Sequence, residues 1–197
     1  MRNQILIILI GSFAIACSIN QSSSNGGGVA LQLENERVEE NFHSNGQIKT
    51  RTLYKKNGKG NWVPDGFVRT WYASGKPRAI LNYSMGVPIG EWETFFENGQ
   101  RYSLQYYDNG KNIGVWKRWY ENGQLSDISE FVQEDGRSIV KHSVYHPNGQ
   151  LSEQGIWLRK NSVNNKFDDV KDGKWDHFDT SGQLLKTEIY KDGQLDK

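Results

Sequence analysis

The sequence predicts an all-β protein, an elongated single-layer antiparallel sheet of stacked β-hairpins. A turn of the form Asn-Gly-Gln, or a close variant of it, recurs six times at intervals of 29, 24, 24, 26 and 33 residues. In every copy an aromatic residue stands four residues before the turn glycine and another stands eight residues after it. The turn glycines are Gly46, Gly75, Gly99, Gly123, Gly149 and Gly182. Periods of 20 to 50 residues are typical of repeat architectures.

The stretch Gly90–Leu125 carries the repeat most clearly. It contains Gly-Glu-Trp at 90–92 and Asn-Gly-Gln at 98–100, and the same pattern returns 24 residues later as Gly-Val-Trp at 114–116 and Asn-Gly-Gln at 122–124. Asn-Gly tolerates the positive φ angles of a tight turn, and both flanks are rich in aromatic and β-branched residues, so each copy is predicted to be a hairpin. No run of residues with helical periodicity competes with this interpretation.

Strand alternation predicts which side chains share a face of each hairpin. Residues seven and three before the turn glycine fall on one face, as in Trp92 with Phe96 and Trp116 with Tyr120, and the residue four before it falls on the other. An isolated hairpin cannot bury such rings, whereas hairpins stacked edge to edge cover one another. About twelve strands at roughly 4.8 Å spacing would form a sheet on the order of 55 Å long. Stability should then rest on ring packing, since 12% of the residues are aromatic.

Residues 1–16 have the pattern of a secretory signal peptide. Arg2 provides a positive head, and an apolar run continues to Ala16, too short to span a bilayer as a permanent helix. The residues at 14–17, Ala-Ile-Ala-Cys, resemble the lipobox of bacterial lipoproteins, which implies that Cys17 is lipidated and becomes the new N-terminus. The alternative is that Cys17 is a bystander in an ordinary secretory signal. Ser18 follows it in place of Asp, which by analogy with enteric bacteria favours the outer membrane.

Residues 17–40 are interpreted as the lipidated cysteine and a flexible tether. Residues 21–28 are all Gln, Ser, Asn or Gly, too poor in apolar groups to offset the entropy of ordering them. Residues 34–40 are charged, and we expect them to be disordered or to form an irregular cap. The six repeats are assigned to residues 41–197.

Two further features of the repeats are expected from spacing. A second glycine closes the unit 11 or 12 residues after the first in four copies, at Gly58, Gly86, Gly110 and Gly193. The interval of 33 residues before Gly182 implies an insertion, which we place as an exposed loop at residues 160–172 because Asn and Asp gather there.

The repeats at residues 41–197 resemble the MORN repeat, and more specifically the bacterial variant found in the YwqK-type antitoxin family. The resemblance is strongest at residues 90–125 and at residues 173–184, where Gly173-Lys174-Trp175 repeats the Gly-Xaa-Trp pattern. Other copies depart from it. The second copy lacks the Trp, the fifth has Val140 and His142 in place of Gly and Trp, and the first has Arg37 and Glu39. The resemblance implies MORN-like hairpins and, through the family name, an antitoxin.

No catalytic constellation stands out, and we expect neither an enzyme nor a cofactor. His142 and His146 suggest a metal pair, but both occupy aromatic positions of their copy, which favours ring substitutes. Asp168, Asp169 and Asp172 suggest calcium but lack the spacing of a calcium loop. The 24 Lys plus Arg balance 23 Asp plus Glu, so nothing in the charge favours nucleic acid.

Two functions from different classes remain. The preferred one is a non-enzymatic, lipid-anchored module of the bacterial envelope, which binds a partner protein or an envelope glycan through one sheet face or an edge strand. The alternative is an antitoxin or immunity protein that caps a toxin. The sequence leaves open whether edge strands pair two molecules into a dimer.

Overall fold

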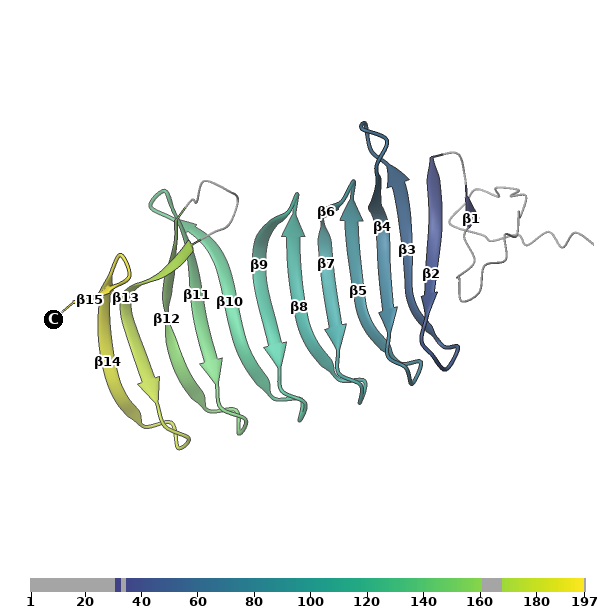
Figure 1. Ribbon diagram of the computed structural model, residues 1–197. Coiled ribbons are helices and arrows are strands. Elements are labelled where there is room, and N and C mark those ends of the chain that lie inside the picture. The colour runs from purple at the N-terminus through teal and green to yellow at the C-terminus, as the bar shows by residue number, and fades with distance from the viewer. Residues whose placement is uncertain (1–30, 33–34, 161–167, 197) are drawn as a thin grey trace, which may run out of the picture. The chain divides into compact units, whose positions relative to one another are not determined.

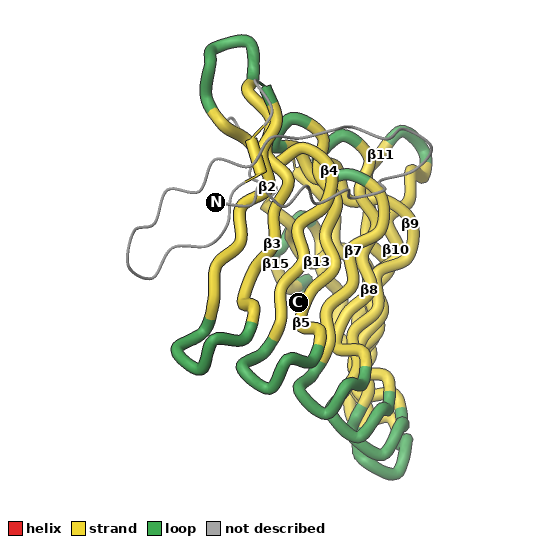
Figure 2. Tube along the Cα trace, turned by 90° about the vertical axis from the view of Figure 1, so that its right-hand side faces the viewer, coloured by secondary structure: helices red, strands yellow, loops and turns green. Residues whose placement is uncertain are grey.

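The computed structural model describes residues 31–32, 35–160 and 168–196, all of them in strands, turns or loops (Figure 1). The proposed leader, Cys17 and the tether up to residue 30 lie outside the described residues. Contacts divide the chain into two units, Met1–Val87 and Pro88–Lys197, which are taken in turn. Figure 2 shows strands and connecting loops only, and within the described residues there is no helix that could cross a membrane. The expected all-β class of antiparallel hairpins is confirmed.

The first unit is an antiparallel sheet whose strands follow one another in chain order. Its strands are β1 (Leu31–Gln32), β2 (Glu36–Phe42), β3 (Ile48–Lys56), β4 (Trp62–Trp71) and β5 (Pro77–Ser84), with the two-residue β6 (Val87–Pro88) at the boundary. β2 corrects one expectation, because residues 36–40 belong to a regular strand that pairs with β3. The guanidinium of Arg37 lies 4.4 Å from the Trp62 ring centroid and 5.5 Å from that of Tyr54, which gives this charged segment an aromatic surface to pack on.

The second unit repeats the same antiparallel order from hairpin to hairpin. Its strands are β7 (Gly90–Phe95), β8 (Arg101–Asp108), β9 (Lys111–Trp119), β10 (Leu125–Glu134), β11 (Arg137–Tyr145), β12 (Leu151–Lys160), β13 (Asp168–Phe178), β14 (Leu184–Lys191) and β15 (Gln194–Leu195). The predicted insertion is shorter than expected, because residues 168–172 are part of β13 and pair with β12. Among the described residues only Ile139, Val140 and Trp175 form buried apolar positions, as expected for a single layer without a central core.

In each unit the Asn-Gly-Gln turns connect the strands at one end of the hairpins, and the other hairpin turns connect them at the opposite end (Figure 1). At the representative turn, Gly123 has a φ of 84°, Tyr120 N–H donates to Gln124 O at 2.8 Å, and Gly123 N–H donates to Tyr120 O at 2.9 Å. The glycine alone has positive φ, and Asn122 does not. The positive φ of this turn is thus carried by the glycine, and the asparagine has another role.

That role is a clasp between successive copies. Asn122 Oδ1 accepts a hydrogen bond from Gln124 N–H at 3.0 Å, while its Nδ2 donates to the carbonyl of Pro147 in the next copy, also at 3.0 Å. The same pair of bonds is made by Asn45, Asn98 and Asn148, whose Nδ2 atoms reach Ala73, Glu121 and Thr180. We call this arrangement the asparagine clasp. It joins the first, third, fourth and fifth copies to the copy that follows each of them, at the turns, where the strands have already ended.

Replacing Asn122 by Ala is expected to lower the free energy of unfolding by about 1 to 2 kcal/mol, since two hydrogen bonds are lost and a turn carbonyl loses its partner. Urea unfolding followed by circular dichroism measures this change. The matched control is Glu121→Ala at the exposed neighbouring position, for which a change within about 0.5 kcal/mol is expected. Equal effects of the two substitutions would show that the clasp contributes nothing.

The turns at the opposite end of the hairpins have the two-residue form, with positive φ at both positions. They are Met85-Gly86, Asn109-Gly110, Asp135-Gly136 and Asp192-Gly193. Gly86, Gly110 and Gly193 thus lie in turns as expected. Gly58 does not have positive φ, because the first copy uses a longer loop, residues 57–61, in which Gly60 takes that conformation instead. Gly136 was not expected, since it stands 13 residues after Gly123 and breaks the predicted spacing.

Candidate functional site

A β-bulge positions the tryptophan of two Gly-Xaa-Trp patterns in the second unit, at Trp116 and Trp175. The register of β8 and β9 shifts between Leu104 and Tyr106, and Gly114 there has a φ of 67°, a conformation that side chains resist. At the bulge the Trp116 side chain reaches the neighbouring strand β8, where its Nε1–H donates to Tyr106 O at 3.0 Å. Trp175 follows the same geometry, with its Nε1–H donating to Ile156 O at 3.2 Å. The glycine of the pattern is therefore required by the bulge.

The tryptophans and the aromatic residues eight after each turn form a ladder on one face of the second unit. We call this the ring face and define it by Trp92, Tyr107, Trp116, Phe131, Trp157 and Trp175. Successive centroids from Trp92 to Phe131 are 4.6, 5.0 and 4.8 Å apart, and those of Trp157 and Trp175 are 4.9 Å apart, all at steep interplanar angles. These tilted and edge-to-face contacts are favourable aromatic geometries, so the ladder packs the hairpins against one another.

The ladder is interrupted at the fifth copy, and a groove of about 430 Å³ lies there. On β11 the positions of the glycine and the tryptophan are taken by Val140 and His142. Val140 lies directly opposite Phe131 on one side and Trp157 on the other. The groove is lined by Gln105, Asn112, Trp116, Lys117, Arg118, Asp127, Ser129, Phe131, Val140, His142, Trp157, Arg159 and Asp169. The groove therefore lies at the copy that departs most from the repeat pattern in this unit.

Two ion pairs lie at the groove. Arg118 Nε donates to Asp127 Oδ1 at 3.0 Å, and Arg159 Nε donates to Asp169 Oδ1 at 3.3 Å. The Arg159 guanidinium also lies 4.9 Å from the centroid of Phe131. Each arginine faces a carboxylate, so these four charges cancel in pairs, and Lys117 is the remaining charged residue of the lining.

His142 is held in the groove as a neutral, partly buried imidazole. Its Nδ1 lies 3.0 Å from the Ser129 hydroxyl oxygen. Burial lowers the pKa of His142 below its usual value, and the nearby carboxylates of Asp127 and Glu153 only partly oppose this effect. A neutral imidazole keeps the floor of the groove uncharged at neutral pH.

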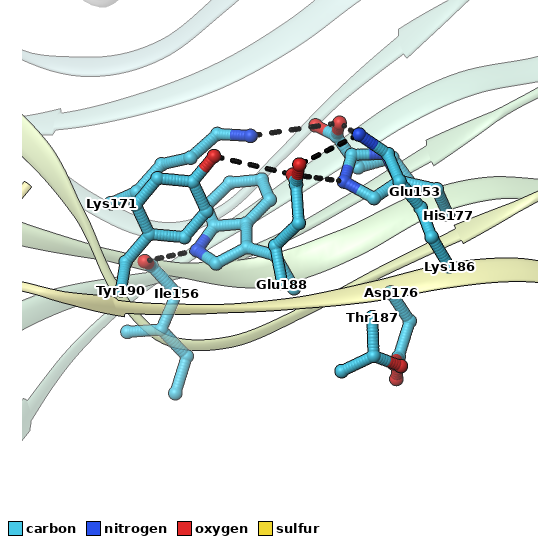
Figure 3. A network of polar contacts seen from close by, with 10 residues as sticks. Glu153, Ile156, Lys171, Asp176, His177, Lys186, Thr187, Glu188 and Tyr190 are labelled. Carbon is cyan, nitrogen blue, oxygen red and sulfur yellow. Dashed lines mark hydrogen bonds and ion pairs between the residues drawn. The ribbon is translucent and has the colours of Figure 1, made fainter. Parts of the chain in front are cut away.

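A polar network lies beside the groove on the same face of β12, β13 and β14 (Figure 3). His177 stands between two carboxylates, with Nδ1 3.1 Å from Glu153 Oε2 and Nε2 2.9 Å from Glu188 Oε2. Lys186 Nζ lies 2.7 Å from Glu188 Oε1, and the Tyr190 hydroxyl donates to the same carboxylate at 3.2 Å. The network ties three strands together next to the fully buried ring of Trp175.

These contacts make Glu188 a source of pH-dependent stability. The hydrogen bond from Lys186, followed by those from His177 and Tyr190, lowers the pKa of Glu188 to about 2, against a value of 4.5 without them. A depressed folded-state pKa stabilises the fold above pH 4.5, and that stabilisation is lost as the pH falls towards 2. Glu188→Gln is therefore expected to unfold more readily than the native chain at pH 7 and to show a smaller loss of stability between pH 5 and pH 2.

Denaturant unfolding at several pH values measures this difference. Glu97→Gln, at an exposed position before a turn, serves as the control and is expected to follow the native pH profile. Parallel profiles for the native chain and Glu188→Gln would contradict the assignment.

The residues singled out in the sequence fall into three groups. The turn glycines 46, 75, 99, 123, 149 and 182 all have positive φ, and Trp92, Trp116 and Trp175 all lie on the ring face. Cys17 lies outside the described residues, so its lipidation remains a prediction. His142 and His146 do not form a pair. His142 contacts Ser129, whereas His146 lies at the turn, with its Nε2 3.1 Å from Phe178 O. Asp169 and Asp172 face Arg159 and Arg137, and within residues 31–32, 35–160 and 168–196 no three metal-ligating side chains form a cluster.

Sequence reasoning missed Arg118, Asp127, Ser129, Arg159 and Asp169 as groove residues. A signal for the first pair was available. Arg118 and Asp127 stand five before and four after the turn glycine, the positions that Thr94 and Ser103 occupy in the preceding copy, where their hydroxyls are 2.6 Å apart. Aligning polar as well as aromatic positions would have paired them.

The family model of the MORN repeat variant matches the chain at residues 38–56, 88–109, 113–133 and 171–192. These matches correspond to the first, third, fourth and sixth copies, so the chain carries MORN repeat variants at four places. No curated protein matches the chain. The copies around Gly75 and Gly149 are outside the matches, and the second of them contributes Val140, His142, Trp157 and Arg159 to the lining of the groove. A repeat sheet of this kind is typical of a binding or scaffold module, not of an enzyme.

Proposed function

We propose that the protein is a non-enzymatic binding module that holds a partner protein on the ring face of its second unit. The observation that carries the proposal is the groove at the fifth copy. Its volume of about 430 Å³ lies in the range of ligand-binding pockets, and its lining combines aromatic walls with a few polar groups. Aromatic residues and arginine are also the side chains that contribute most to protein interfaces.

Affinity capture tests this proposal. Residues 18–197, immobilised and exposed to envelope extract, are expected to retain a partner that the variant Trp157→Ala does not. Ile189→Ser is the matched control, because Ile189 is an exposed apolar residue on the face opposite to Glu188 and away from the groove. A partner retained equally by all three proteins would place the binding surface elsewhere, and capture of no partner at all would contradict the proposal.

The proposal includes an anchor in the bacterial envelope, in the outer membrane. It is supported by the apolar run that ends in the lipobox-like residues 14–17 and by the Gly- and Ser-rich tether that follows. A lipid on Cys17 would hold the repeats at the membrane surface while the tether keeps them clear of it.

Cys17→Ser is expected to move the protein from the membrane fraction to the soluble fraction, because one thiol carries the whole attachment. Fractionation followed by a carbonate wash and immunoblotting measures this shift. The control is Ser18→Ala, which leaves the thiol in place and should stay with the membranes. A Cys17→Ser protein that resists the wash would require a different anchor.

A second candidate is an antitoxin or immunity protein, in which the ring face caps a toxin domain. The matches to the MORN repeat variant and the resemblance to the YwqK-type family favour it. Genetics separates it from a general binding module. The antitoxin role predicts that deleting this gene alone harms growth and that deleting a neighbouring toxin gene as well restores it. Healthy growth of the single deletion would leave only the general binding module.

A further inference from the structure

We infer that the protein associates with itself, through contact between the first unit of one molecule and the second unit of another. The contact joins the ends of the hairpins that carry the Asn-Gly-Gln turns and their variants, which we call the turn ends (Figure 1). The inference does not involve the groove, so it is independent of the proposed function.

The two units carry opposite charge. Residues 35–87 hold nine Lys or Arg and four Asp or Glu, whereas residues 88–197 hold 14 Lys or Arg and 18 Asp or Glu. The net charge of +1 for the whole chain conceals this separation. Surfaces of opposite charge attract each other and favour association in one orientation.

The carboxylates of the first unit already have partners, and most of its cations do not. The four carboxylates form ion pairs at 2.5 to 3.9 Å, namely Glu36–Lys55, Asp65–Lys55, Glu39–Arg37 and Glu40–Arg51. The other six basic side chains face no carboxylate among the described residues, and they are Lys49, Lys56, Lys59, Arg69, Lys76 and Arg78. The unit therefore has positive charge available for a partner.

Three of these cations lie at the turn end of the first unit. Lys49 and Arg78 each stand three residues after a turn glycine, in successive copies, and Lys76 directly follows Gly75. All three cations are exposed. No Asp or Glu stands in the two turns of this unit, at residues 43–47 and 72–76. The turns here bring positive charge and no negative charge.

The turn end of the second unit has the reverse charge. Glu97 and Glu121 each stand two residues before a turn glycine, again in successive copies, and both are exposed. Neither carboxylate has an ion pair within the part of the chain that the structure describes. No Lys or Arg stands in the four turns of this unit, at residues 96–100, 120–124, 146–150 and 179–183.

The two sets of charges have the same spacing because both follow the repeat. Lys49 and Arg78 lie at the start of β3 and β5, which have β4 between them. Glu97 and Glu121 come just after β7 and β9, which have β8 between them. Two strand intervals amount to about 9.6 Å in each unit. Two cations one copy apart can therefore face two carboxylates one copy apart, and a second molecule of this protein matches the basic turns in both charge and spacing.

Sedimentation velocity on residues 18–197, which include every described residue, tests the inference. At about 100 µM protein and about 20 mM NaCl we expect association that increases with concentration. At about 0.5 M NaCl we expect a monomer, since screening shortens the range of charge contacts. Trp157→Ala should associate like the native chain, because the groove takes no part. A monomer at low salt, or an oligomer equally stable at high salt, would overturn the inference.

Charge reversal locates the two surfaces. Lys49→Glu with Arg78→Glu is expected to weaken self-association about tenfold or more, and Glu97→Lys with Glu121→Lys is expected to do the same, because like charges then meet. An equimolar mixture of the two variants places opposite charges across the contact again and should associate about as tightly as the native chain. All four positions are exposed, and thermal unfolding verifies that both variants are folded.

Lys56→Glu with Lys59→Glu is the matched control. It makes the same change of charge in the same unit, but at the other end of the hairpins, so association should stay within about twofold of the native value. A loss as large as that of the turn-end variants would attribute the effect to net charge and reject the contact. A mixture of the two turn-end variants that fails to associate would also reject it, because the cations would then have a partner other than these carboxylates, such as a phosphate-bearing polymer.

Discussion

Replacing Trp175 by Ala is expected to lower the free energy of unfolding by about 3 to 5 kcal/mol, the cost of removing a large buried aromatic side chain. Trp175 is 0% exposed and is the only fully buried large side chain among the described residues. Its ring centroid lies 4.9 Å from that of Trp157, and the ammonium of Lys171 lies 4.0 Å from the centroid of the Trp175 ring. Its loss also leaves the carbonyl of Ile156 without the indole donor.

Urea unfolding at pH 7 measures this loss, and two variants separate its causes. Trp175→Phe keeps a ring but removes the indole donor, so it should lie between the native chain and Trp175→Ala. Leu185→Ala changes an apolar residue that is 65% exposed and should shift stability by about 0.5 kcal/mol or less. If Trp175→Ala behaved like Leu185→Ala, the ladder would not be the main source of stability.

Gly155→Ala is the second large effect that we expect. A Cβ at Gly155 would lie 2.2, 2.4 and 2.7 Å from three atoms of the Trp175 ring, far inside van der Waals contact. Either the indole or the strand must move, and overpacking of this kind costs about 1 to 3 kcal/mol, with larger values when the neighbours cannot shift. The backbone of Gly155 itself has an ordinary φ, so the clash is the sole reason for the loss.

A double-mutant cycle with Trp175→Ala isolates that clash. In the absence of the indole the alanine at 155 has no ring to meet, so the double variant should be more stable than the sum of the two single losses predicts. Gly58→Ala is the matched control, because a Cβ there meets nothing within 4 Å and the φ of Gly58 is also ordinary. Additive losses at 155 and 175 would show that the two positions do not interact.

The hairpins could be predicted from the sequence because their signals are local. A turn glycine and its aromatic flanks lie within about a dozen residues, and every turn glycine from Gly46 to Gly182 has the positive φ that its context predicts. The ring face followed from strand alternation for Trp92 and Trp116. The segment at residues 36–40 was misjudged, because charge was taken as a sign of disorder while Arg37 packs on Trp62, more than twenty residues away.

The features that escaped prediction depend on how one copy meets the next. Asn122 uses its side chain to hold Pro147, and Gly155 leaves room for Trp175, but neither partner is adjacent in the sequence. The groove was also missed for this reason. Val140 and His142 were recognised as departures from the repeat, but their effect depends on Phe131 and Trp157 standing on either side of them.

The asparagine clasp has a consequence for how such a protein changes length over evolution. Each clasp points toward the following copy and meets a main-chain carbonyl, an acceptor that any residue type provides. A gene duplication of 24 codons between the third and fourth copies would therefore deliver a new hairpin with its joint already made. The array can therefore gain or lose whole units without any new contact between copies being required. An individual unit can then diverge in sequence, as the fifth one has.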